Sequence, residues 1–175
     1  MTVDADVSAS DQRAFRDVMG VFATGVAVIT TEIDGTPQGM TVNSLTSLSV
    51  HPPLLLACLT DGTRTAAAVI ARGAFVVNVL TRNQRHLSDR FAKHGRQHFE
   101  QLATVLSHGG IPTLPGCAGH IECDVAAVHS GGDHLIVVGR VRACRAAPAS
   151  PLLFYRGRYH RLAGPGHDEI PLAIR

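Results

Sequence analysis

The sequence predicts a mainly β fold with helices inserted singly, arranged as a partly closed antiparallel barrel. Six or seven β-rich segments follow one another, often with only a turn between them, and two or three helical segments interrupt the series. Strands that follow strands in this way run as hairpins, and closing them into a barrel hides their edges. The pattern G-x-G-x-x-G is absent, so a doubly wound parallel sheet is not expected.

The composition is that of one globular domain. Of the 175 residues, 45% are hydrophobic and 17% are charged, and the net charge is +2. No lysine and arginine cluster indicates nucleic-acid binding. The acidic N-terminus is unlike a signal peptide, and no apolar run approaches the roughly 20 residues of a membrane span. We therefore expect a cytoplasmic protein with a flexible tail at 1–9, one domain at 10–164 and a second tail at 165–175.

Helical spacing and glycines define the helices that we expect. Ser8 to Asp11 resembles a capping box, and apolar residues at helical spacing then continue to Gly25. A second helix starts at Thr63 as N-cap and ends at Gly73. A third spans 83–95, with Leu87 and Phe91 on its inner face.

The strands are predicted by β-branched and apolar runs between turn residues. Those in the first half begin at residues 26, 39, 53 and 74. After a long surface excursion at 96–118, a hairpin spans 119–146 with Gly131 and Gly132 at its turn. One last strand, 152–162, closes the domain.

An unusual run of small polar side chains lies at 39–50, directly before the apolar strand 53–60. Hydroxyl and amide groups occupy both faces of this run, and none of them is charged. Such groups suit the edge of a neutral heteroaromatic ring, because they satisfy its carbonyls and nitrogens without adding charge. A polar edge strand or a bulged loop is the structural alternative.

The junction DGTRT, residues 61–65, follows that apolar strand and begins a helix. A helix N-terminus offers free N–H groups and partial positive charge. Two hydroxyls and the guanidinium of Arg64 make this start suitable for a phosphate group. An ordinary capped helix with a surface arginine explains the same residues.

Cysteines and histidines do not predict a metal site. Cys58, Cys117, Cys123 and Cys144 form no C-x-x-C pair, and we expect them to be reduced core residues. His94 and His98 are four residues apart, a spacing that zinc ligands also use. Gly95 lies between them and no carboxylate is placed beside them, so a polar helix end is the preferred interpretation.

Several motifs in order resemble one enzyme family. They are FATGVAVITT, GMTVNSLTSLSVHPPLLLACLTDGTRT, FVVNVL with LSDRFA, GGDHLIVVGRV and LLFYRGRYHRL. Over residues 12–162 the chain resembles the short-chain flavin reductases, the reductase components of two-component flavin-dependent monooxygenases. The resemblance implies an FMN-binding split β-barrel, antiparallel and Greek-key-like, that forms a homodimer.

The resemblance also implies contacts for each part of the flavin. The isoalloxazine ring would be lined by Thr41, Val42, Asn43, Ser44 and Ser47. Cys58, Leu59 and Thr60 would lie along the ring and ribityl chain, and Thr63, Arg64 and Thr65 would hold the phosphate. Arg90 and Phe91 would close over the flavin, and His134, Tyr155, Arg156 and Tyr159 would face the nicotinamide.

Some of these residues also have purely structural explanations. Phe91 and Leu59 suit a core, and Tyr155 and Tyr159 suit interface packing. His134 follows a Gly-Gly-Asp turn, and a hydrogen bond from its ring to that loop would also explain a histidine at this position.

On this resemblance the enzyme oxidises NADH or NADPH, passes a hydride from nicotinamide C4 to N5 of FMN or FAD, and supplies reduced flavin to a partner monooxygenase. The cofactors carry the chemistry, so no catalytic acid or base is needed. Two other functions stay open: a flavin-binding sensor or carrier without turnover, and a split-barrel oxidase acting on a pyridoxine-type phosphate.

Overall fold

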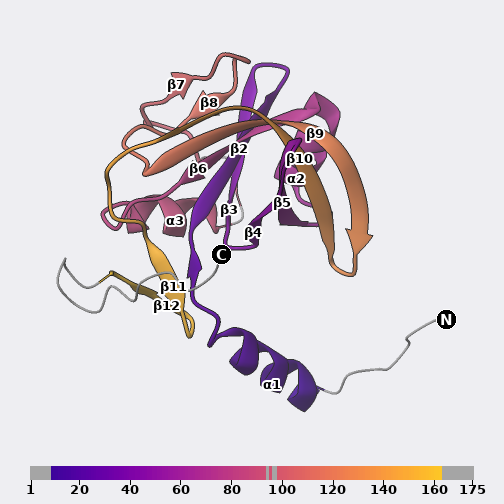
Figure 1. Ribbon diagram of the computed structural model, residues 1–175, viewed down its shortest axis with the longest axis vertical. Helices are drawn as coiled ribbons and strands as arrows, with labels where there is room; N and C mark the ends of the chain where they lie inside the picture. The colour runs from indigo at the N-terminus through magenta and orange to yellow at the C-terminus, as the bar shows by residue number, and fades with distance from the viewer. Residues whose placement is uncertain (1–8, 94, 96–97, 163–175) are drawn as a thin grey trace.

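The structure is a computed structural model that describes residues 9–93, 95 and 98–162 (Figure 1). The tails expected at 1–9 and 165–175 lie outside the described residues except for Ala9, which begins the first helix. The division into tails and one domain therefore stays a prediction.

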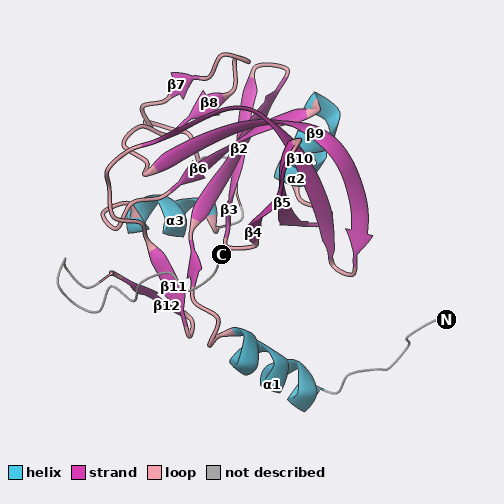
Figure 2. Cartoon of the chain, viewed as in Figure 1, coloured by secondary structure: helices cyan, strands magenta, loops and turns pink. Residues whose placement is uncertain are grey.

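The described chain is mainly β, with three helices inserted between strands (Figure 2). The helices are α1 (Ala9–Met19), α2 (Arg64–Arg72) and α3 (Arg85–Phe91). The first six strands are β1 (Thr24–Gly25), β2 (Ala27–Ile33), β3 (Thr36–Val42), β4 (Leu45–Val50), β5 (Pro53–Thr60) and β6 (Ala74–Val79). The others are β7 (Val105–Leu106), β8 (Pro112–Thr113), β9 (Gly119–Gly131), β10 (His134–Ala146), β11 (Leu153–Tyr155) and β12 (Arg158–His160).

Seven strands form the main sheet in the order β3-β2-β6-β9-β10-β5-β4, and each neighbouring pair is antiparallel. The two edge strands, β3 and β4, are separated along the chain only by Asn43 and Ser44. The sheet must therefore curl until its edges approach each other (Figure 1). Smaller antiparallel sheets join β1 to β11 and β12, and β7 to β8.

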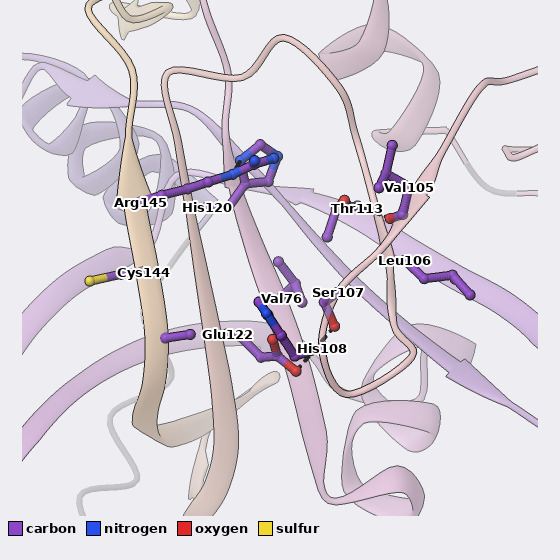
Figure 3. Close-up of a pocket in the computed structure, with 11 residues that line it drawn as sticks. Val76, Val105, Leu106, Ser107, His108, Thr113, His120, Glu122, Cys144 and Arg145 are labelled. Carbon is purple, nitrogen blue, oxygen red and sulfur yellow. Dashed lines mark hydrogen bonds between the residues drawn. The ribbon is translucent and has the colours of Figure 1, made fainter.

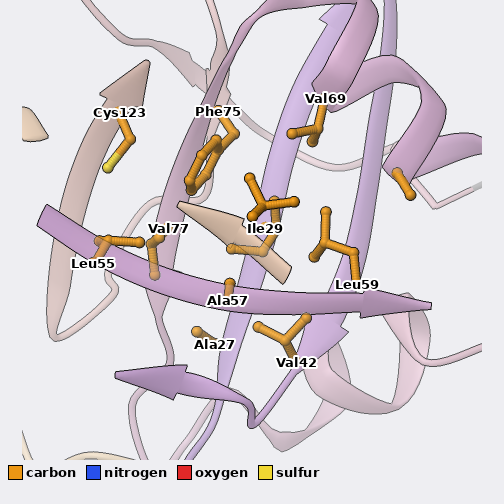
Figure 4. Close-up of a cluster of buried hydrophobic side chains, with 12 residues drawn as sticks. Ala27, Ile29, Val42, Leu55, Ala57, Leu59, Val69, Phe75, Val77 and Cys123 are labelled. Carbon is orange, nitrogen blue, oxygen red and sulfur yellow. The ribbon is translucent and has the colours of Figure 1, made fainter. Parts of the chain in front are cut away.

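The curled sheet encloses a core that alternation along the strands predicts. Leu55, Ala57 and Leu59 of β5 point inward and are buried, and they meet Phe75 of β6 and Val69 of α2 (Figure 4). A second buried cluster, which includes Leu87 and Phe91 of α3, lies on the other side of β2. Packing in these two clusters fixes the helices and strands around the polar loop, which is the short connection between β3 and β4.

Five predicted elements differ from the structure in extent or in kind. The third helix, expected over 83–95, spans only Arg85–Phe91. The first helix ends at Met19, because the chain turns at Gly20 instead of continuing to Gly25. The polar run expected as one strand forms β3 and β4, which pair with different partners, β2 and β5. The excursion contains the hairpin of β7 and β8, and the last strand is the hairpin of β11 and β12.

The final hairpin turns at Arg156 and Gly157, whose φ angles are 47° and 73°. A glycine tolerates this left-handed conformation readily, and so the turn forms where the strand was expected to continue. No helix in the described part of the chain is long and apolar enough to cross a membrane.

Candidate functional site

The polar loop between β3 and β4 is fastened to β5 by one serine. Ser44 Oγ donates to Cys58 O at 2.8 Å and accepts from Cys58 N at 3.1 Å. This contact places Ser44 beside Cys58, whereas Ser47 of β4 pairs with Leu55 further along β5. That Thr41, Val42, Asn43, Ser44 and Ser47 line a flavin ring with Cys58, Leu59 and Thr60 stays a prediction. Asn43 and Ser47 are exposed, whereas the Val42 and Leu59 side chains are buried in the core. Only the main chain of those two residues remains for contact with a ligand at this surface.

The start of α2 lies at the end of β5 and is an ordinary capped helix. Thr63 Oγ1 accepts from Ala66 N at 3.2 Å and donates to Thr60 O at 2.8 Å. The single hydroxyl proton of Thr63 is therefore already used. The amides of Arg64 and Thr65, in the first turn, have no acceptor within the helix. Together with the exposed Arg64 guanidinium they supply the donors that a phosphate needs.

His134 lies at the same end of the sheet, because β10 pairs with β5 and places it opposite Thr60. Its Nδ1 is 2.7 Å from Asp133 Oδ1, and its Nε2 is 3.4 Å from Thr60 Oγ1. The hydrogen bond from His134 lowers the pKa of the exposed Asp133 carboxyl. A carboxylate on Nδ1 orients the ring and leaves Nε2 directed toward Thr60.

Helix α3 joins the end of β3 to the C-terminal hairpin. Thr41 Oγ1 donates to Ser88 O at 2.8 Å, and Ser88 Oγ is 2.9 Å from Tyr159 Oη. The Arg90 guanidinium donates to Glu100 O. Phe91 is buried and meets the Phe99 ring edge-on, with ring centroids 5.0 Å apart. The Phe91 side chain is therefore part of the core, the structural explanation that the sequence left open.

Tyr155 and Arg156 are less closely connected to the polar loop. Arg156 lies over the Tyr155 ring, 5.4 Å from its centroid, and its amide donates to Gly20 O at 2.8 Å. Within residues 9–93, 95 and 98–162, no hydrogen bond or ring contact joins either side chain to Thr41, Cys58 or Thr63. Their place on the nicotinamide side stays a prediction.

Two residues of this region were not singled out in the sequence. Ser88 lies within LSDRFA and is fully buried, yet a serine between apolar helix positions is a weak signal by itself. Asp133 lies in GGDH, and its role as the partner of His134 depends on the turn between β9 and β10. Both acquire their contacts only when distant segments pair.

A cavity of about 210 Å³ lies away from this region, beneath the β7–β8 hairpin (Figure 3). Its walls include His120, Glu122 and Arg145, and no predicted flavin residue lines it. His120 Nε2 is 2.7 Å from Leu114 O, and Arg145 Nε donates to His120 Nδ1 at 3.3 Å. Burial lowers the pKa of His120. The cavity is at the opposite end of β10 from His134, roughly 30 Å along the strand.

The cysteines and histidines form no metal centre among the residues that the structure describes. His94, considered above with His98, lies outside those residues. Burial raises the pKa of Cys117 to about 11 and that of Cys123 to about 12, so these thiols stay protonated near neutral pH. Cys144 is exposed and Cys58 is half-buried, which differs from the expectation that all four are core residues.

Known proteins resemble this chain in sequence and in fold. The flavin reductase like domain family matches residues 19–163. The chain is 44% identical over 152 residues to the flavin-dependent monooxygenase reductase subunit HsaB of Mycobacterium tuberculosis, covering 85% of this chain and 81% of the relative. It is 37% identical over 153 residues to the FMN reductase (NADH) SmoA of Agrobacterium fabrum, covering 87% of each.

A solved structure is similar over almost the whole chain. It is the NADH:FAD oxidoreductase SgcE6 of Streptomyces globisporus, in complex with NAD and FAD fragments. The TM-score is 0.85 at 36% identity, and the match covers 94% of this chain and 99% of that one. With the family match spanning most of the described sheet and the polar loop, this chain belongs to the flavin reductase like domain family.

Proposed function

We propose that this protein is an NAD(P)H-dependent flavin reductase that supplies reduced FMN or FAD to a partner monooxygenase. The observation that carries the proposal is the meeting of three features at one end of the sheet. They are the neutral loop at 41–47, the α2 start at Arg64 and the oriented ring of His134. The relatives HsaB and SmoA, a monooxygenase reductase subunit and an NADH-dependent FMN reductase, support the same activity.

The donor set of this region fits a flavin. The side chains of the loop are neutral, and the Thr41 hydroxyl still has lone pairs although its proton goes to Ser88 O. These groups suit a ring edge that carries both donors and acceptors. Arg64 and the free amides of the α2 start lie one strand further on, where the flavin phosphate would bind.

The protein contributes alignment to this reaction. Flavin and nicotinamide together supply the hydride chemistry when both are bound. Ser44 holds the polar loop against β5. Asp133 orients the ring of His134, which lies opposite Thr60 at the end of β5. We place Tyr155, Arg156 and Tyr159 on the nicotinamide side with His134, because their hairpin contacts α3 through Tyr159.

An assay of each nucleotide with each flavin tests this function. NADH or NADPH is mixed with FMN or FAD, and nucleotide oxidation is followed by absorbance under air. We expect oxidation that depends on both enzyme and added flavin. Flavin binding without any nucleotide oxidation would identify a sensor or carrier instead. Oxidation of a pyridoxine-type phosphate without added nucleotide would identify the oxidase alternative.

We further propose that the curled sheet is a split barrel, and that the protein is a homodimer in the cytoplasm. The approach of β3 and β4 at Asn43 and Ser44 supports the barrel. The N-terminal segment supports the dimer: α1 projects from the body (Figure 1) and exposes Phe15, which is 66% accessible, and Phe22, just after the helix, is 69% accessible. A second copy of the chain would cover these rings.

A further inference from the structure

Ser88 of α3 has a buried hydroxyl that the proposed flavin site does not itself require. Its accessible fraction is 0%, and a buried hydroxyl normally has a partner. The partner of Ser88 Oγ is Tyr159 Oη at 2.9 Å, on a strand 71 residues further along the chain. The main-chain oxygen of the same residue accepts from Thr41 Oγ1 at 2.8 Å. One residue thus contacts both the flavin loop and the C-terminal hairpin.

Two other side chains also contact the ring of Tyr159. The guanidinium of Arg85, one turn before Ser88 on α3, lies 5.1 Å from the ring centroid. The Phe154 ring packs edge-on, with centroids 5.5 Å apart. Arg85 is itself paired with Asp89 at 3.3 Å. Among these contacts, only the Ser88 hydroxyl fixes the phenol oxygen.

We infer that Ser88 is a positioning residue through which α3 sets the orientation of Tyr159 on the nicotinamide side. The inference rests on the proposed function. The two contacts of Ser88 are separate: its side-chain oxygen is hydrogen-bonded to Tyr159, and its main-chain oxygen accepts from Thr41. Loss of the Ser88 hydroxyl removes the hydrogen-bond partner of the phenol oxygen of the half-buried Tyr159, so the ring shifts toward another partner. The Thr41 contact stays, because the main chain is unchanged.

Ser88→Ala tests the side-chain contact alone. We expect KM for NADH to rise roughly five- to tenfold, the effect of about one lost hydrogen bond. The flavin Kd, measured by fluorescence quenching without nucleotide, should stay within about twofold of wild type. Ser150→Ala, at an exposed serine, is the matched control and should change neither constant.

Tyr159→Phe removes the other partner and should raise KM for NADH by a similar factor. In the double variant both partners of this hydrogen bond are gone, so its loss should be clearly smaller than the product of the two single losses. Equal loss of flavin and nucleotide binding in these variants would overturn the inference, because it would indicate general loss of structure. Unchanged constants would overturn it too. If Ser88→Ala does not fold, Tyr159→Phe carries the same test.

A direct readout of the ring is available because the chain has two tyrosines and no tryptophan. Protein labelled with 3-fluorotyrosine should give two fluorine resonances, and Tyr159→Phe assigns them. Ser88→Ala should shift the Tyr159 resonance and leave that of Tyr155 in place. An unmoved Tyr159 resonance would refute positioning even if wild type reduces flavin. Absence of nucleotide oxidation by wild type would instead refute the proposed function.

Discussion

The hydroxyl groups at the candidate site are mostly committed to the main chain. Thr41 donates to Ser88 O, Ser44 to Cys58 O, and Thr63 to Thr60 O. Because a hydroxyl has one proton, these three side chains can only accept hydrogen bonds from a ligand unless they break an existing contact. With these three excluded, donors to flavin carbonyls and phosphate would come from main-chain amides and from the exposed side chains of Asn43, Ser47 and Arg64.

Arg64 is the residue whose role can be tested most directly. Replacement of Arg64 by Ala should weaken FMN binding roughly tenfold, the effect of one charge-assisted hydrogen bond, and leave riboflavin binding unchanged. Fluorescence titration of both flavins measures this difference. Arg140→Ala, at an exposed arginine of β10, serves as the control and should affect neither. Equal losses for FMN and riboflavin would remove Arg64 from the phosphate role.

His120 makes stability depend on pH. Burial lowers its pKa below the usual 6.5, so the unfolded chain binds the proton more readily than the folded chain. The free energy of unfolding should therefore fall as pH drops from about 6.5 toward the lower folded-state pKa. In His120→Gln the difference between about pH 7.5 and about pH 5.5, from urea titrations, should be smaller than in wild type. An undiminished difference would contradict this assignment.

At the scale of elements, β10 passes very close to the core. A Cβ atom at Gly139 would lie 2.6 Å from Phe75 Cζ and 3.0 Å from Cys123 Cβ. Both neighbours are buried, with 1% and 0% accessibility, and neither has room to withdraw. The missing side chain at Gly139 therefore leaves room for the Phe75 ring of β6, two strands away in the sheet.

Gly139→Ala should lower the free energy of unfolding by about 1 to 3 kcal/mol, the usual range for overpacking a core. Chemical denaturation measures the change. Gly25→Ala is the control, since a Cβ there has nothing within 4 Å and the residue also lies in a strand. If both substitutions lower the free energy of unfolding by similarly small amounts, the side chains around Phe75 can shift to accept a methyl group.

In the polar run at 39–50, the pairing of strands decides where one strand ends and the next begins. Its composition indicates that it is not a regular core strand, but it does not give the position of the break. The break falls at Asn43 and Ser44, because β3 must pair with β2 while β4 pairs with β5. At this point the Ser44 hydroxyl forms hydrogen bonds with both the N–H and the C=O of Cys58. These bonds take the place of main-chain hydrogen bonds between two strands.

At the scale of the whole molecule, the exposed face of α1 predicts self-association. Phe15 and Val18 lie on one face of α1 and are each 66% accessible, and Phe22, in the turn that follows the helix, is 69% accessible. Helices this short rarely persist in water without packing. Light scattering after size exclusion should therefore give about twice the 18.5 kDa chain mass.

Phe15→Glu combined with Phe22→Glu should convert the dimer to monomer, because two carboxylates would be buried at the contact. Arg13→Glu, on the opposite face of the same helix, should leave the mass unchanged. A dimer that survives the double substitution would place the interface elsewhere. A monomeric wild type would contradict the homodimer itself.

The sequence by itself determined the mainly antiparallel β class, the α2 start at Thr63 and the polar loop before β5, because periodicity, capping and turn residues act between near neighbours. Tertiary structure alone decided which hydroxyls remain available to a ligand. The contacts of Ser44 with Cys58 and of Ser88 with Tyr159 join residues 14 and 71 positions apart. Such contacts form only when the sheet curls and buries them, since no local pattern encodes the partner of a lone serine.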